Sequence, residues 1–60
     1  MKFIKAIDTS NIEYLIAPEH VVYATVDEKR NHIKLVFMGG SLSMNLAEDQ
    51  FRAVRSALVG

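Results

Sequence analysis

Apolar and polar positions alternate along most of residues 2–46, and a period of two is typical of half-buried β-strands. Turn-forming residues interrupt the alternation, because Asp, Asn and Gly favour tight turns and Pro cannot donate to a sheet ladder. The cleanest stretch places Leu42, Met44 and Leu46 on one face. We expect strands over residues 2–7, 12–17, 20–26, 32–38 and 41–46, with turns at Asp8 to Asn11, Ala17 to His20, Asp27 to Asn31 and Gly39-Gly40.

The period changes to that of an α-helix after residue 46. Phe51, Val54 and Leu58 follow one another at positions i, i+3 and i+7, which predicts one amphipathic helix over about residues 47–58. Asn45, with Glu48 three residues later, resembles a capping box at its start.

The pattern therefore predicts an α+β fold with the order β-β-β-β-β-α. We expect a small antiparallel meander of four or five strands, with the C-terminal amphipathic helix packed on one face of the sheet. The expected core consists of Phe3, Ile7, Ile16, Val22, Val26, Ile33, Leu35, Phe37, Leu42, Met44, Leu46, Phe51, Val54 and Leu58.

The length of 60 residues indicates a single domain, 1–60, with a marginally stable core. Half of the residues are hydrophobic, the formal net charge is zero and there is no cysteine. Disulfides are excluded, so stability must come from the core, from association, or from both. We expect no membrane span and no signal peptide, and therefore a cytoplasmic protein.

No arrangement of residues indicates catalysis. The carboxylate pairs Asp27/Glu28 and Glu48/Asp49 are adjacent in sequence and point apart, and no partner is placed beside them. His20 and His32 are too few for a zinc site of their own. We therefore expect no enzyme, no metal and no cofactor.

The strongest lead is a second apolar sheet face. If residues 20–26 and 32–38 pair, then Val21, Tyr23, Val36 and Met38 would lie together opposite the core. Two interpretations remain open, because this face is either curled into the monomer or packed against a second subunit or another protein.

A basic hairpin is the alternative site. Lys29, Arg30, His32 and Lys34 cluster at the loop between these strands and could contact phosphates of a nucleic acid. The acidic pair in the same loop and the zero net charge favour a solvated turn instead.

The segment from Ala17 to Leu58 resembles LytTR-type DNA-binding domains. In order, the segment contains the stretch from Pro18 to Tyr23, a charged hairpin, the Gly39-Gly40 turn, a last strand and an amphipathic helix, as that family does. In length and in its N-terminal strand pair the chain is similar to small FlbD-type flagellar proteins, although Met38-Gly39-Gly40 stands where that type has an Asn-Gly-Lys turn. The resemblance implies a small β-rich regulatory or adaptor module, and it transfers no functional residue.

The sequence thus predicts a small non-enzymatic protein–protein interaction or regulatory module that self-associates through a sheet face. A nucleic-acid-binding regulator that uses the basic 29–34 hairpin is the alternative function, and we expect no membrane partner.

Overall fold

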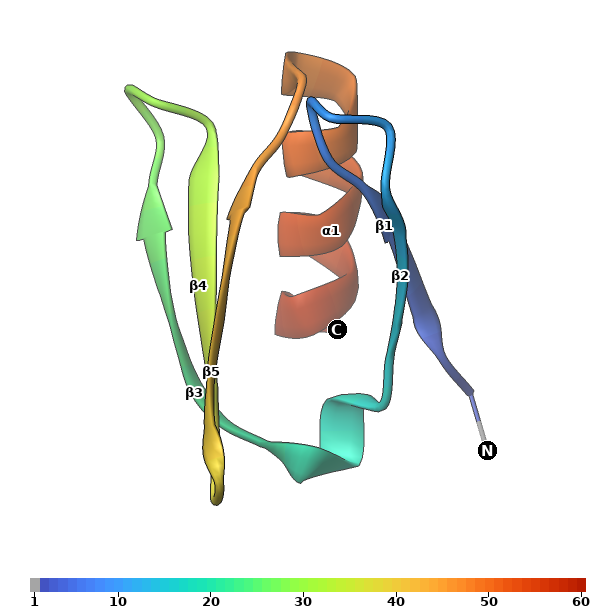
Figure 1. The fold of residues 1–60 in the computed structure, drawn as a ribbon, viewed down its shortest axis with the longest axis vertical. Coiled ribbons are helices and arrows are strands. Elements are labelled where there is room, and N and C mark those ends of the chain that lie inside the picture. Colours follow the sequence, from blue (N-terminus) through green and yellow to red (C-terminus); the bar gives the residue numbers. More distant parts are fainter. Residues whose placement is uncertain (1) are drawn as a thin grey trace.

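The chain folds into two antiparallel sheets and one helix, in a computed structural model that describes residues 2–60. Figure 1 shows the helix lying between the N-terminal hairpin and the three-stranded meander. The α+β class, the order of elements and the C-terminal helix are as the sequence predicts. The elements are β1 (Ile4–Ile7), β2 (Glu13–Ile16), a 3₁₀ turn (Pro18–His20), β3 (Val21–Asp27), β4 (His32–Phe37), β5 (Gly40–Asn45) and α1 (Glu48–Val59).

The three-stranded sheet has the order β3-β4-β5. Its inner face carries the β4 residues Ile33 and Leu35, which are fully buried and pair with Met44 and Leu42 of β5. Its outer face is polar over β5, where Ser43 lies opposite Lys34. The alternation predicted for β4 and β5 is confirmed.

A β-bulge interrupts the start of β3. Val21 pairs with Phe37, but Tyr23 already pairs with Val36, so Val22 has no partner in β4. At a bulge, two residues of one strand lie opposite a single residue of its partner. The extra residue shifts the alternation, so the side chains before the bulge point to the other face of the sheet. Val21 consequently packs against the core, whereas Val22 is 58% exposed.

In the N-terminal hairpin, the face of β1 that packs against the core is the opposite of the predicted one. Ala6 is completely buried and Ile4 packs against the core, whereas Phe3 is exposed. The sequence prediction was wrong here because both faces of this strand carry apolar residues. Lys5 shares a face with Phe3, and its ammonium group reaches an exposed carboxylate of Glu13 at 3.4 Å.

One isolated bridge joins the two sheets, between Asp8 and Leu46. Thr9 strengthens it, because its amide donates to the carbonyl of Asn45 over 2.8 Å. The amide of Ile7 also donates to the side-chain oxygen of Gln50 in α1 at 3.2 Å. The hairpin is therefore held by both the end of β5 and the helix.

The core lies where the two sheets and α1 meet. Seven of the predicted core residues are buried there, and Ala6, which was not predicted, completes the cluster. Two further errors lie on β3, where Val22 and Val26 are exposed by 58% and 41%. The remaining predicted members, Ile7, Phe37, Leu42 and Leu58, are half-buried, and the confirmed buried ones are Ile16, Ile33, Leu35, Met44, Leu46, Phe51 and Val54.

Two local predictions are corrected. The N-cap of α1 is Ala47, which has no side-chain capping bond, and Asn45 instead lies beside His32, with its Oδ1 2.9 Å from the ring Nδ1. The turn after β4 consists of Met38 and Gly39, and neither takes a positive φ. Gly40 already belongs to β5 and pairs with Phe37.

Candidate protein interface on strand β3

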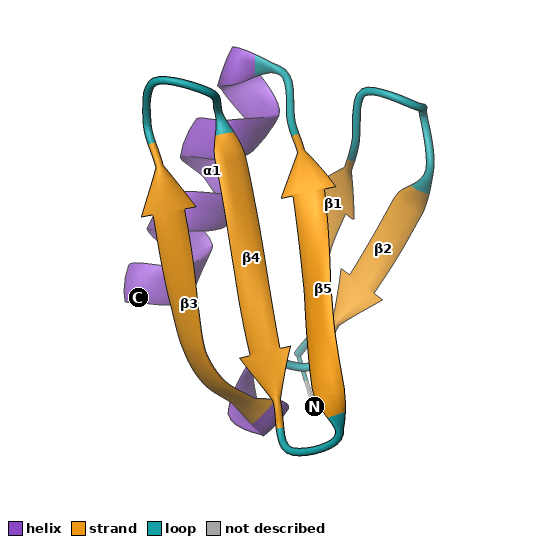
Figure 2. Cartoon of the chain, turned by 60° about the vertical axis from the view of Figure 1, so that its left-hand side comes forward, coloured by secondary structure: helices purple, strands orange, loops and turns teal. Residues whose placement is uncertain are grey.

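Strand β3 is one of the two edges of the three-stranded sheet, and the other edge, β5, is bridged to the N-terminal hairpin at its end. Strand β3 is seven residues long and pairs with β4 on one side only. Figure 2 shows this strand at the outside of the sheet, with no further strand beside it. A free edge presents unpaired backbone N–H and C=O groups, and these can pair with a strand of another chain.

The register fixes which groups of β3 face outward. Phe37 and Gly40 enclose a two-residue turn, so they form a hydrogen-bonded pair, and the odd-numbered residues of β4 bond to β5. The even-numbered residues of β4 must then bond to β3, at Tyr23, Thr25 and Asp27. The backbone groups of Ala24 and Val26 therefore point to the free edge.

Exposed apolar side chains lie on both faces of this edge. Tyr23 is 57% exposed on the outer face, and Val26 is 41% exposed on the inner face. Val22, at the bulge, is also largely exposed. Edge strands of monomeric proteins usually carry charges or proline at such positions. Residues 21–26 contain neither.

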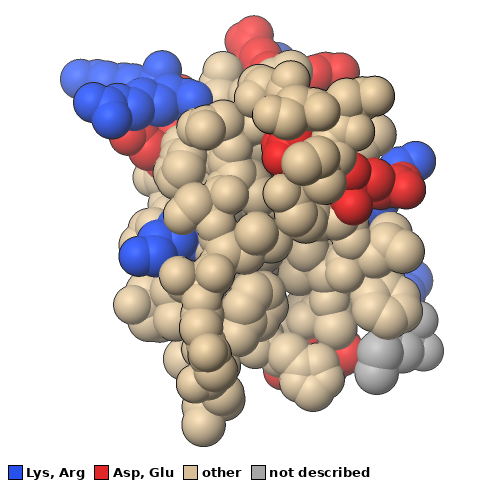
Figure 3. All heavy atoms as spheres, viewed as in Figure 1, with Lys and Arg blue, Asp and Glu red and all other residues tan. Residues whose placement is uncertain are grey.

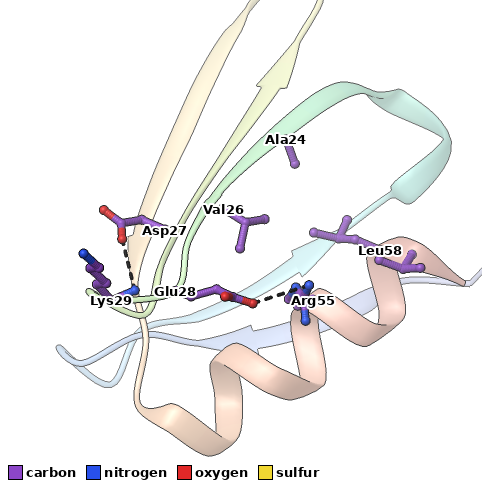
Figure 4. Close-up of a pocket in the computed structure, with 8 residues that line it drawn as sticks. Ala24, Val26, Asp27, Glu28, Lys29, Arg55 and Leu58 are labelled. Carbon is purple, nitrogen blue, oxygen red and sulfur yellow. Dashed lines mark hydrogen bonds and ion pairs between the residues drawn. The ribbon is translucent and has the colours of Figure 1, made fainter.

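An open groove of about 850 Å³ runs between the inner face of β3 and the last turns of α1. Figure 4 shows Ala24 and Val26 on one wall and Leu58 on the other. At one end an Arg55–Glu28 ion pair of 3.4 Å crosses the groove and connects the helix to the β3–β4 loop. The groove exists because α1 packs over β1 and β4 and leaves β3 uncovered.

The four residues predicted for the second sheet face do not all lie together. Tyr23 and Val36 are paired neighbours on the outer face, as predicted. Val21 faces the core because of the bulge, so its assignment to this face was wrong. Met38 lies in the β4–β5 turn and is 93% exposed.

The predicted basic cluster is spread around the β3–β4 hairpin. Figure 3 shows Lys and Arg side chains at the hairpin end in the upper left, with carboxylates directly beside them. Arg30 lies 3.9 Å from Asp27, whose carboxylate also accepts the amides of Lys29 and Arg30. The ring of His32 contacts Asn45, while the exposed Lys34 lies in the middle of the outer face. The four residues do not form one continuous basic surface.

No cluster of three or more metal-ligating side chains forms among residues 2–60. Tyr14, in the N-terminal hairpin, has a shifted pKa. Its pKa is raised above the usual value of 10.0 by partial burial, by its hydrogen bond to Asp8, and by the negative charge of that carboxylate.

Sequence reasoning missed the groove and the edge. Val26 and Leu58 were both expected in the core, but they lie on opposite walls of the groove and Val26 is exposed. Alternation places Val26 on the inner face without revealing how far the helix reaches over it. The absence of charges from residues 21–26 was the available signal, because an unprotected strand of this length is unusual at an edge.

Comparison with known proteins identified no relative of this chain. No family model, curated protein or solved structure matches this chain. None of the helical segments between Lys2 and Gly60 combines the length and the apolarity needed to span a bilayer.

Proposed function

We propose that this protein is a non-enzymatic protein–protein interaction module that self-associates through the β3 side of its three-stranded sheet. The observation that carries the proposal is the long, unpaired edge of β3 with exposed Val22, Tyr23 and Val26. Association would cover these side chains and pair the outward backbone groups of Ala24 and Val26.

Size and composition support association. The single core of such a small domain contributes little net stability, and oligomerisation is one of the common ways to add to it. The zero net charge reduces repulsion between copies. A tyrosine with neighbouring apolar residues and a polar surround is also the typical composition of the centre of a protein interface.

The test is the molar mass in solution, measured by light scattering during size-exclusion chromatography over a range of concentrations. We expect the wild type to form a dimer. Tyr23→Asp places a charge in the middle of the covered surface, where its desolvation is costly, and we expect this variant to elute as a monomer.

Leu15→Asp is the matched control. Leu15 is 64% exposed on the N-terminal hairpin, so the substitution has the same chemistry at a site away from β3. It should leave the mass of the dimer unchanged. A Tyr23→Asp protein with the mass of the wild type would refute the proposal, as would a wild type that remains monomeric at all concentrations.

Three parts of the functional assignment stay predictions from the sequence. These are the regulatory role, the cytoplasmic location and the resemblance to FlbD-type and LytTR-type proteins. The nucleic-acid alternative gains no support from the geometry, because acidic partners accompany the cations of the hairpin loop.

A further inference from the structure

We propose that two copies of this chain join edge to edge through antiparallel pairing of their β3 strands, with the twofold axis at Ala24. The partner of the edge is thus a second copy in one defined register, and the product is a continuous six-stranded sheet. This inference rests on the proposed function and adds to it the geometry of the contact.

The backbone groups at the middle of β3 point in the direction that this pairing needs. Ala24 lies at the middle of β3, and its N–H and C=O point to the free edge because those of Tyr23 and Thr25 are directed to β4. An Ala24–Ala24 pair across the axis would therefore form two hydrogen bonds. The small side chain keeps this crossing free of steric conflict.

The side chains of β3 are self-complementary in this register. Each residue lies opposite the residue equally distant from Ala24 on the other copy. Val26 of each copy then lies opposite Val22 of the other, and Tyr23 of each copy lies opposite Thr25 of the other. The two exposed valines of β3 would thus cover each other as cross-strand pairs.

Side chains of opposite charge lie beyond the two ends of β3. Glu19 precedes the strand and Lys29 follows it, and both lie five residues from Ala24. Antiparallel pairing brings Glu19 of each copy to the end that carries Lys29 of the other. Neither side chain forms an ion pair within residues 2–60. Within one copy the strand separates them by about 20 Å or more.

The bulge at Val22 does not oppose this arrangement. Bulges often protect edges because they twist the strand away from a neighbour. Here the bulge lies at the beginning of β3, between Val21 and Tyr23. In the proposed register it therefore lies at the two ends of the pairing, whereas Tyr23, Ala24 and Thr25 at the centre keep a regular register with β4.

The experiment is a charge exchange at the two ends of the strand, with the dimer dissociation constant measured by sedimentation equilibrium. Lys29→Glu and Glu19→Lys each place like charges opposite one another at two symmetric contacts. Exposed pairs contribute modestly, so we expect each single variant to raise the dissociation constant by about tenfold. The double variant restores opposite charges at both contacts, and its dissociation constant should return to the wild-type value.

The double variant is decisive because its net charge equals that of the wild type. Lys2→Glu, an exposed site before the first hairpin, is the control for a change of net charge and should leave the dissociation constant unaltered. Circular dichroism of each variant verifies that it is folded.

The outcomes separate this inference from the proposed function. A monomeric wild type would overturn both. A dimeric wild type whose dissociation constant is unchanged in the single variants, or is not restored in the double variant, would overturn the β3–β3 register and leave self-association standing. Restoration in the double variant would establish the register.

Discussion

Asp8 organises the first turn of the chain. Its carboxylate accepts the amides of Ser10 and Ile12, each at 2.9 Å, and the hydroxyl of Tyr14 at 3.1 Å. Asp side chains stabilise turns in this way, because they replace backbone hydrogen bonds that the turn leaves unmade. Asn11 takes a positive φ of 64° beside it, a conformation that asparagine tolerates better than most residues.

The phenol of Tyr14 should make stability depend on pH in the alkaline range. Its folded pKa is raised above the usual 10.0, so the folded protein keeps the proton at a pH where the unfolded chain loses it. This contribution to stability is complete below pH 10 and is lost as the pH rises from there through the folded pKa. A Tyr23→Phe protein leaves Tyr14 as the single phenol, and its phenolate absorbance should appear above pH 10. A midpoint below that value would contradict the assigned contact with Asp8.

At the scale of elements, residue patterns predicted the strands and the helix but not all of their faces. β5 and α1 were predictable because each has apolar residues at one period and polar residues between them. β1 was not, since apolar residues occupy both of its faces and only packing chooses between them. The bulge in β3 was also unpredictable, because no glycine marks it, and it alone reversed the face of Val21.

The start of α1 illustrates the same limit. Ala47 is the N-cap, and Gln50, three residues later, binds the amide of Ile7 instead of closing a capping box. The sequence suggested Asn45 because its side chain is a good cap, but the strand β5 extends to that residue and directs the side chain to His32. Tertiary contacts thus decided a choice that local propensity left open.

Ala47→Ser should stabilise the protein. The extended backbone of Ala47, with φ −68° and ψ 159°, suits an N-cap, and a serine hydroxyl there could accept an amide of the first helical turn. We expect a gain of about 1 kcal/mol, which corresponds to about 4–8 °C in the melting temperature of so small a domain. Ala47→Val is the matched comparison, because its side chain has no acceptor and should give no such gain. An Ala47→Ser protein that is no more stable than the wild type would contradict the cap at residue 47. Thermal unfolding followed by circular dichroism measures both.

At the scale of the whole molecule, the helix lies close to the N-terminal hairpin. α1 makes more contacts with β1 than with any strand of the meander. Ala6 is completely buried at this junction, together with Phe51 and Val54 of the helix. A small side chain lets two layers approach closely, so the hairpin and the helix share one tightly packed core.

Ala6→Leu tests this closeness. Adding three carbons to a packed site forces neighbouring side chains away from their preferred rotamers, and we expect a loss of about 1–3 kcal/mol. Phe3→Leu, at an exposed position of the same segment, should change stability by less than about 0.5 kcal/mol. Urea denaturation gives both values. An Ala6→Leu protein as stable as the wild type would show that Ala6 does not lie in a closely packed site.

The contact between Ile7 and Gln50 also has a consequence for when the chain can fold during its synthesis. The two residues are 43 positions apart, and the hairpin that contains Ile7 packs against α1 and is bridged to Leu46. On a ribosome, the first hairpin emerges long before the helix that covers it. While the helix is still inside the exit tunnel, the hairpin lacks the element that covers it, so we expect this domain to complete its folding only after α1 has emerged.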